Sequence, residues 1–161
     1  MRPEAVPIAP RPRSVPYYLQ KALKKWLGQC VEEEIFEEVP EGEAVTWCSP
    51  LVVQPKATFN AVDKEKLEWQ MIRASVDLRV TNQFMERNRI TQGLTVEHFL
   101  YKFHECTVFS KLDMWQGYRQ LFLDLESRKI ATFSTPRGNM PPKHLIFGAK
   151  PSQHLYDEVM Y

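Results

Sequence analysis

A carboxylate at the end of an apolar run is the residue of this chain best suited to chemistry. Residues 108–112 read V-F-S-K-L and lead to Asp113, and a glycine and an aromatic residue follow at Gly117 and Tyr118. A strand that carries one aspartate at its tip holds that side chain in the fixed geometry that metal binding requires. Magnesium prefers such hard oxygen ligands, together with substrate phosphates and water. In the alternative interpretation, Asp113 only caps the turn over residues 114–118.

Five blocks of the sequence, in the same order along the chain, resemble blocks of reverse transcriptases, in particular those of Gypsy-type LTR retrotransposons. The first catalytic block of that family, F-S-K-L-D-L-x-x-G-Y-H-Q-I-P-L, is similar to residues 108–120, with Arg119 in place of the histidine. The other four blocks are W-C-S-P-L-V-V-Q-P-K (47–56), R-A-S-V-D-L-R-V-T-N (73–82), S-R-K-I-A-T-F-S-T-P-R-G (127–138) and L-I-F-G-A-K (145–150). The resemblance covers about residues 15–160, nearly the whole chain.

The resemblance implies an α+β fold made of the fingers and part of the palm of a polymerase, with an antiparallel sheet and packed helices. Residues 15–161 would form this reverse transcriptase domain, truncated before the Y-x-D-D hairpin. Residues 1–14 contain four prolines and three arginines, which is typical of an extended linker. In retroelement polyproteins, such linkers join the polymerase to an upstream segment.

The resemblance also assigns roles around the reacting nucleotide. Asp113 would be the catalytic carboxylate, and it would bind Mg²⁺ together with the backbone carbonyl of Met114. Tyr118 would pack under the incoming sugar and exclude a ribose 2′-OH, and Phe147 would flank the base. For both aromatic residues, a plain role in the hydrophobic core is the alternative.

Four polar residues match positions of the family that contact phosphate or template. Arg73 and Lys56 would bind the triphosphate, and a planar guanidinium suits phosphate better than an ammonium does. Arg79 would contact the template strand, and Asn82 would stabilise the same region. The alternative is a surface ion pair, for example between Asp77 and Arg79.

The chain lacks the second half of the family's catalytic site. Two-metal phosphoryl transfer in these enzymes also needs the two aspartates of Y-x-D-D, and no Asp-Asp pair occurs in the sequence. One carboxylate cannot hold two Mg²⁺ ions against their desolvation cost. The resemblance implies RNA-directed DNA synthesis from dNTPs as the parent activity. Because the second half of the catalytic site is missing, we expect no polymerase activity from this chain by itself. The missing strands would also leave a sheet edge and an apolar face uncovered.

The complete enzyme would bind an RNA or DNA template-primer and dNTPs, and it would be joined to thumb, RNase H and integrase domains. Two other readings stay open. The chain is a truncated or repurposed module that binds nucleotide or nucleic acid without catalysis, or it is a non-functional remnant that folds poorly.

Composition sets weaker limits. The net charge of +1 over 161 residues gives no global attraction for nucleic acid, so any binding must come from local patches. No apolar run approaches the length of a membrane span, and no signal-peptide core is visible. The three cysteines form no C-x-x-C and the four histidines show no zinc spacing. A cytoplasmic or nuclear location is expected.

The pattern of apolar residues predicts the elements that carry these side chains. A helix starts near Val15-Pro16 with Ser14 as its N-cap, and its apolar stripe excludes three lysines, which read as a solvated face. An acidic stretch over 32–43 should lie away from the template. The remaining elements expected are strands over 51–54 and 71–76, a loop-like insert over 57–69, a helix over 95–103 with Val96, Phe99 and Leu100 inward, strands over 107–112, 120–123 and 129–134, a turn over 124–127, a hairpin at 136–139, and a helix from Ser152.

Overall fold

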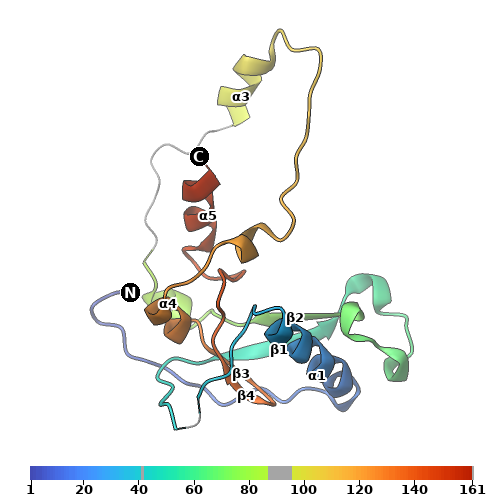
Figure 1. The fold of residues 1–161 in the computed structure, drawn as a ribbon, viewed down its shortest axis with the longest axis vertical. Coiled ribbons are helices and arrows are strands. Elements are labelled where there is room, and N and C mark those ends of the chain that lie inside the picture. The colour runs from blue at the N-terminus through green and yellow to red at the C-terminus, as the bar shows by residue number, and fades with distance from the viewer. Residues whose placement is uncertain (41, 87–95, 161) are drawn as a thin grey trace.

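The computed structural model describes residues 1–40, 42–86 and 96–160 and confirms the α+β class (Figure 1). Four 3-10 turns lie between the regular elements, at η1 (Ala57–Phe59), η2 (Lys64–Lys66), η3 (Trp69–Met71) and η4 (Gly117–Gln120). The helices and strands are α1 (Tyr17–Glu32), β1 (Ser49–Pro55), β2 (Ile72–Val76), α2 (Thr81–Phe84), α3 (Val96–Phe103), α4 (Leu125–Ile130), β3 (Phe133–Thr135), β4 (Gly138–Met140) and α5 (Ser152–Met160).

The four strands form one sheet in the order β2-β1-β3-β4. The strands predicted over 51–54 and 71–76 are confirmed as β1 and β2, which pair antiparallel from Leu51 opposite Val76 to Pro55 opposite Ile72. The predicted hairpin at 136–139 is also confirmed, with Thr135 opposite Gly138. The sheet is not wholly antiparallel, however, because β1 and β3 pair in parallel at Ser49 and Phe133.

Helix α1 covers the sheet through the apolar stripe that its sequence predicts (Figure 1). The fully buried members of the stripe are Leu19, Ala22, Leu23, Leu27 and Cys30. The three lysines of the helix are exposed, as expected for a solvated face. The core centres on Phe133, which is completely buried and lies edge-on to Phe36 at a centroid distance of 4.9 Å. Trp26 packs on the other side of Phe36, at 5.6 Å.

The predicted start of α1 is wrong by two residues. Pro16, not Ser14, occupies the N-cap position, and no side chain caps the helix. Val15 precedes a proline, and the proline ring disfavours the helical conformation for the residue before it. The helix therefore begins only at Tyr17.

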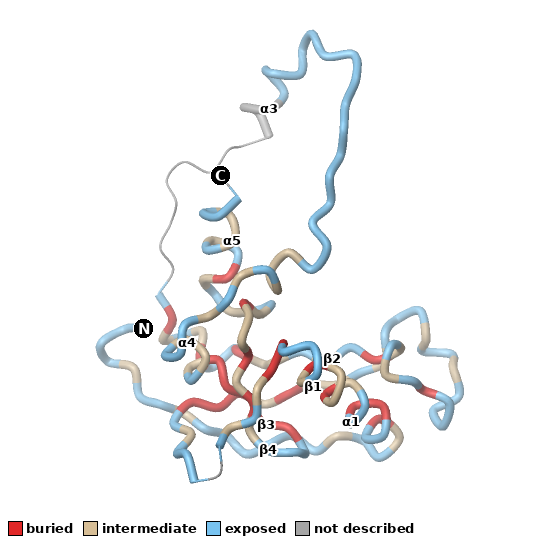
Figure 2. Tube along the Cα trace, in the orientation of Figure 1, coloured by how far each residue is buried: buried red, intermediate tan, exposed pale blue. Residues whose placement is uncertain are grey.

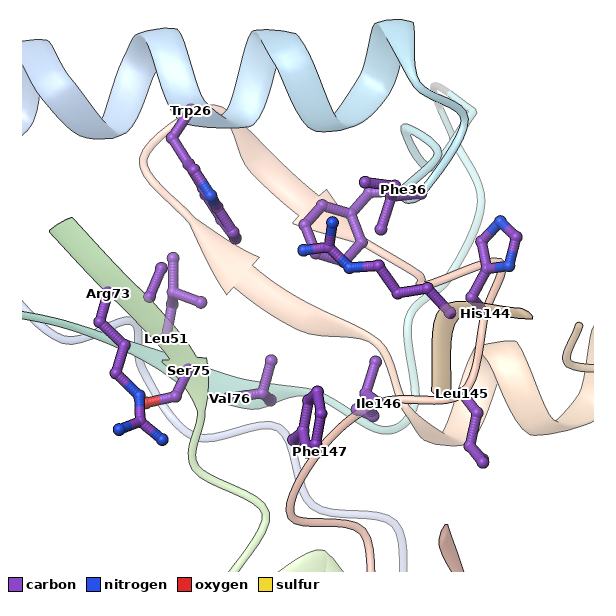
Figure 3. Close-up of a pocket in the computed structure, with 13 residues that line it drawn as sticks. Trp26, Phe36, Leu51, Arg73, Ser75, Val76, His144, Leu145, Ile146 and Phe147 are labelled. Atoms are coloured by element: carbon purple, nitrogen blue, oxygen red, sulfur yellow. The ribbon is translucent and has the colours of Figure 1, made fainter. Parts of the chain in front are cut away.

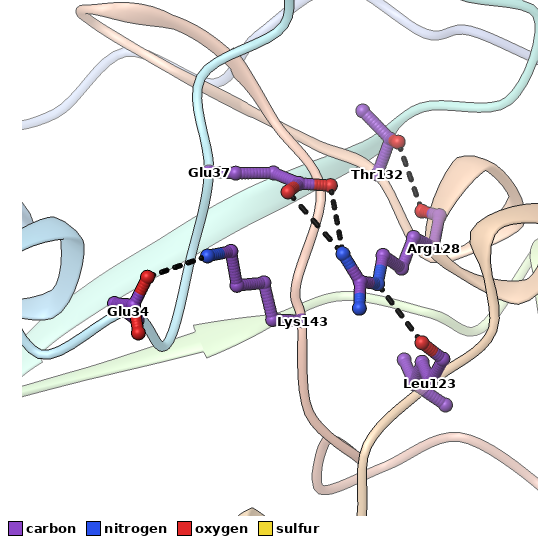
Figure 4. A network of polar contacts seen from close by, with 6 residues as sticks. All are labelled: Glu34, Glu37, Leu123, Arg128, Thr132 and Lys143. Atoms are coloured by element: carbon purple, nitrogen blue, oxygen red, sulfur yellow. Dashed lines mark hydrogen bonds and ion pairs between the residues drawn. The ribbon is translucent and has the colours of Figure 1, made fainter.

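The acidic stretch after α1 is tied to the second half of the chain by ion pairs (Figure 4). Glu34 binds Lys143 at 3.1 Å, and Glu37 binds Arg128 at 3.3 Å. The Arg128 guanidinium also donates to the Leu123 carbonyl at 2.9 Å. These carboxylates therefore serve a structural role on the face where α4 packs.

Two of the three strands predicted downstream of residue 106 are replaced by other structure. Residues 129–134 divide between the end of α4 and the short strand β3. The Asp124 carboxylate accepts hydrogen bonds from the backbone N–H and the hydroxyl of Ser127. It thereby caps a helix at the place where we expected a turn. Residues 120–123, the third predicted strand, form an isolated bridge from Phe122 to His144. The predicted strand over 107–112 is absent.

Residues 104–116 instead form an arm that extends away from the sheet (Figures 1 and 2). Every residue from 100 to 116 is exposed, with Leu112 at 95% and Val108 at 84%. Leu100 is 61% exposed, so its predicted inward position is wrong. A strand forms only where a neighbour binds its backbone N–H and C=O groups. Within the described part of the chain, no strand takes that place beside residues 107–112.

The N-terminal segment 1–14 lies along the domain and is bound to it at three points. The Arg2 amide donates to the Phe84 carbonyl at 2.9 Å, and the Cys48 amide donates to the Ile8 carbonyl at 3.0 Å. Arg13 forms an ion pair with Asp77 at 2.5 Å.

Among the described residues, no helix combines the length and apolar composition that crossing a membrane requires.

We expect Phe133→Ala to lower the free energy of unfolding by about 3–5 kcal/mol, because it opens a cavity between α1 and the sheet. Urea unfolding followed by circular dichroism measures this change. The matched control is Tyr17→Ala at the start of α1, where the ring is 89% exposed; that variant should stay within about 0.5 kcal/mol of the parent. Equal losses in both variants would contradict a core centred on Phe133.

The ion pairs of Asp77 predict a dependence of stability on acid. The hydrogen bonds that Arg79 donates, with the charge of Arg13, lower the pKa of the Asp77 carboxyl from 3.8 to about 2. A carboxyl with a lowered folded-state pKa stabilises the fold above its ordinary pKa, and that stabilisation is lost as the pH falls through 3.8 toward 2. Asp77→Asn should flatten this part of the profile of urea midpoint against pH. Glu158→Gln on α5 should leave it unchanged, and parallel profiles for all three proteins would refute the assignment.

Candidate functional site

A cavity of about 140 Å³ lies where α1, β2 and the segment 144–147 meet (Figure 3). The polar groups at its wall belong to Arg73, Ser75, Arg119 and His144. The apolar wall is formed by Trp26, Ile35, Phe36, Leu51, Ala74, Val76, Leu145, Ile146 and Phe147. Pockets for whole drug-sized ligands are about 300–1,000 Å³, so this cavity fits only part of a nucleotide.

Two of the predicted nucleotide-binding residues, Arg73 and Phe147, line this cavity together (Figure 3). Side chains of β2 alternate, so Ile72 is buried in the core while Arg73 is exposed. Phe147 is 70% exposed, so its ring is accessible to a ligand. A guanidinium and an open aromatic face are thus presented to one space.

Lys56 does not line the cavity, but the strand register brings it close to Arg73. The Lys56 amide donates to the Met71 carbonyl at 2.8 Å, one step beyond the last pair of the β1–β2 ladder. Since Gln54 pairs with Arg73, Lys56 and Arg73 are diagonal neighbours on one face of this ribbon. Both side chains are exposed, and two neighbouring cations suit a polyphosphate.

Tyr118 joins this site through aromatic contacts. Its ring lies 4.4 Å from the ring of Phe147 and 5.2 Å from that of Tyr156 on α5. Its hydroxyl donates to the Gln153 side chain at 2.5 Å. Burial raises the pKa of Tyr118, and the nearby Asp157 carboxylate adds to the shift. Tyr118 is thus half-buried against two other rings and is not a member of the hydrophobic core, and its role against a ribose stays a prediction.

The close approach of α5 depends on the absence of a side chain at Gly117. A Cβ atom there would lie 2.6 Å from the Tyr156 hydroxyl. Neither Tyr156 nor Gln153 stood out in the sequence as a site residue. Their spacing of three along a helix, which puts both on one face, was the available signal.

Asp113 and Met114 lie on the exposed arm, outside the cavity lined by Arg73. The predicted strand that would carry Asp113 at its tip is the one that the structure lacks. The alternative role of Asp113, capping the turn over residues 114–118, is not seen among the described residues either. A side chain that does bind this turn is that of Gln120, whose amide donates to the Trp115 carbonyl at 3.0 Å. Within the described part of the chain, no three His, Cys, Asp or Glu side chains gather closely enough to hold a metal ion. The described residues therefore do not bring a set of three such ligands together, and the role of Asp113 and the Met114 carbonyl toward Mg²⁺ stays a prediction.

Arg79 has the ion pair that we considered as its alternative role. Its guanidinium donates twice to Asp77, with both bonds at 2.8 Å. The carboxylate raises the pKa of Arg79 further above its ordinary value. The side chain is still 79% exposed, so the pair leaves donors open to solvent. Template contact by Arg79 is therefore compatible with this pair and stays a prediction.

Asn82 fixes the loop that follows Phe147. Its amide nitrogen donates to the Gly148 carbonyl at 2.8 Å, and its oxygen accepts from the Lys150 amide at 2.7 Å. Asn82, which we predicted to lie on the template side, thus fixes the backbone of residues 148–150 through these two hydrogen bonds. It supports the nucleotide-side cavity through the backbone next to Phe147.

Sequence reasoning missed three of the residues at the cavity wall, Phe36, Arg119 and His144. Arg119 was noted only as a departure from the family, which has histidine there. His144 lies 4.3 Å from the ring of Phe122, and burial lowers its pKa. No spacing in the sequence connects these residues, since the cavity joins segments more than a hundred positions apart.

No family model matches the chain. Two curated proteins are similar in sequence. The retrovirus-related Pol polyprotein from transposon 412 of Drosophila melanogaster is 28% identical over 130 residues, which are 81% of this chain and 10% of that protein. The uncharacterized protein K02A2.6 of Caenorhabditis elegans is 25% identical over 156 residues, 97% of this chain and 11% of that protein.

Two of the solved structures with a similar fold are foamy viral protease-reverse transcriptases. The foamy viral protease-reverse transcriptase dRH in complex with ds DNA superposes with a TM-score of 0.63 over 99% of this chain and 25% of that one. The Prototype Foamy Virus Protease-Reverse Transcriptase CSH mutant gives 0.71 over 98% and 19%. Sequence identity is 14% in both. The chain thus spans about a tenth of its curated relatives and a quarter or less of these structures.

The assignment to the Gypsy type stays a prediction, because neither comparison separates the retrotransposon types. The broader resemblance is confirmed: this chain is similar in sequence to retrotransposon Pol polyproteins and has an α+β fold like that of retroviral reverse transcriptases.

Proposed function

We propose that this chain is part of a reverse transcriptase within a retrotransposon polyprotein, and that its parent activity is RNA-directed DNA synthesis from dNTPs. The observation that carries the proposal is the cavity that Arg73 and Phe147 line together, with Tyr118 packed behind Phe147. Arg73 and Phe147 come from different sequence blocks that match the same family, and they meet at one place in a fold of that family.

Within this proposal, Arg73 and Lys56 bind the triphosphate of the incoming nucleotide. Phe147 covers the base or sugar, and Tyr118 limits the space at the 2′ position. Asn82 holds residues 148–150 and thereby the position of Phe147. Arg79 contacts the template strand with the donors that Asp77 leaves free.

The complete reaction needs groups that the described residues do not supply. Bound Mg²⁺ ions would neutralise the charge that develops on the phosphates, and Asp113 with the Met114 carbonyl would provide one part of their ligands. The other carboxylates would come from the Y-x-D-D block. We infer that this chain alone does not polymerise, and that thumb, RNase H and integrase domains complete the polyprotein. The buried thiols of Cys30 and Cys48, which form no disulfide in the described structure, fit a reducing cytoplasmic or nuclear compartment.

The second candidate function is a nucleotide- or nucleic-acid-binding module without catalysis. One observation favours it: Asp113 lies on the exposed arm, while the cavity lined by Arg73 is formed without it. Reading the coding frame past Tyr161 separates the two. An in-frame Asp-Asp block followed by Mg²⁺-dependent dNTP incorporation supports the enzyme, and an authentic stop codon there supports the module.

Asp113→Asn tests the catalytic assignment in a longer polypeptide that includes the Y-x-D-D block. Loss of one metal-binding charge should reduce Mg²⁺-dependent dNTP incorporation by about a hundredfold or more. Primer extension on an RNA template measures it. Glu105→Gln removes an exposed carboxylate from the same arm and should retain activity. Full activity of Asp113→Asn would refute the role of Asp113.

Tyr118→Ala tests the steric role of the ring in the same polypeptide. Without the ring, the site should accept a ribose, so the ratio of rNTP to dNTP incorporation should rise by about tenfold or more. Tyr118→Phe is the matched control, because it keeps the ring and loses only the bond to Gln153. An unchanged ratio in Tyr118→Ala, or an equal rise in Tyr118→Phe, would contradict the steric role.

A further inference from the structure

A second groove, of about 330 Å³, lies between the N-terminal segment and the sheet edge. One wall comes from residues 8–13 and the other from the start of β1 and residues 77–83. Among the described residues that line it, the charged ones are Arg11, Arg13 and Arg79 and a single carboxylate, Asp77. Its apolar lining comes from Ile8, Pro10, Pro50 and Val80.

The segment that supplies Arg11 is held on both sides of that residue. Upstream, the Ile8 carbonyl accepts the bond from the Cys48 amide at 3.0 Å. Downstream, Arg13 binds Asp77 at 2.5 Å. Pro10 and Pro12 flank Arg11 directly, and each fixes its own φ. The backbone between the two anchors is therefore stiff. Little backbone conformational entropy is lost when Arg11 binds a ligand.

The groove has a positive excess that the chain as a whole lacks. Three guanidinium groups face one carboxylate, and the pKa of that carboxyl is about 2, so Asp77 is ionised at neutral pH and still balances only one of the three. Each guanidinium has five N–H donors. Arg13 and Arg79 together therefore have more donors than the Asp77 carboxylate can accept. Side-chain exposures of 48% for Arg13 and 79% for Arg79 leave the other donors open. In the described part of the chain, Arg11 has no ion pair.

We propose that this groove binds the phosphate backbone of single-stranded nucleic acid, and that residues 8–13 are part of the template-binding surface instead of a passive linker. The proposal rests on the proposed function, because it extends the template contact of Arg79 across the groove to Arg11 and Arg13. Guanidinium groups match phosphate oxygens in pairs. An apolar floor beside them suits the sugars and bases of an unpaired strand. A groove of about 330 Å³ has the size for about one nucleotide of a single strand.

The test is the binding of a fluorescently labelled twelve-nucleotide oligo(U) to this chain, followed by anisotropy over a series of salt concentrations. Arg11→Gln should weaken binding several-fold, and Arg11→Gln with Arg13→Gln should weaken it by about tenfold or more. The slope of log affinity against log salt should fall by about 0.7 for each arginine removed, because each releases about that many counterions from a single strand. Arg11→Lys keeps the charge and should keep the slope.

Two controls separate charge from folding. Arg2→Gln changes the same segment outside the groove, and Arg137→Gln changes the cation of the β3–β4 hairpin, which binds Glu38; both should leave affinity and slope unchanged. Arg13 also anchors the segment, so Arg11→Gln is the decisive variant, because Arg11 anchors nothing in the described structure. Unfolding midpoints of all variants are compared with that of the parent.

Three results would overturn the proposal. The first is an unchanged slope in Arg11→Gln while Arg79→Gln weakens binding, which would leave the template role of Arg79 and the proposed function intact. The second is the absence of any binding at low salt. The third is tighter binding of a duplex with the same arginine dependence, which would exclude the single strand. Failure of the proposed function itself is read separately, from dNTP incorporation by the longer polypeptide.

Discussion

Strand β1 is hydrogen bonded on both edges, and this double pairing determines what the rest of the chain can form. One edge binds β2 over five residue pairs, and the other binds β3 over two. Backbone N–H and C=O groups buried without a partner are costly, so a central strand needs both neighbours. Helix α1 then covers the face that these strands share, with Phe133 completely buried beneath it. The same rule explains the arm: residues 107–112 have the composition of a strand and, within the described chain, no neighbour to bind.

Local patterns in the sequence were enough to predict the sheet edge and the first helix. The β-forming residues of β2 predicted the strand, and the apolar stripe of α1 predicted its buried face. These elements are decided by periodicity and burial alone. The hairpin at 136–139 followed from its turn residues. In each case, the contacts that decide the structure lie close in the sequence or follow one simple period.

The errors arose where a competing local interaction or a distant partner decided the outcome. Asp124 caps α4, and the cap overrides the strand preference of the residues that follow. The strand before Asp113 depends on a neighbour, which composition cannot reveal. For the site, the sequence blocks named Arg73 and Phe147, whereas Phe36 and His144 lie outside the blocks and reach the same cavity only through tertiary packing. Residues of a site are predictable when a motif contains them and are missed when only the fold assembles them.

The contact between Gly117 and Tyr156 links two parts of the molecule that would otherwise change independently. A side chain at residue 117 would meet the Tyr156 ring at 2.6–2.9 Å, so it fits only where Tyr156 moves aside or is replaced. Tyr156 also touches Tyr118, which touches Phe147. Two ring contacts, from Tyr156 to Tyr118 and from Tyr118 to Phe147, therefore connect α5 to the wall of the cavity. Helix α5 thus supports one side of an opening whose other lining residues come from as far away as α1.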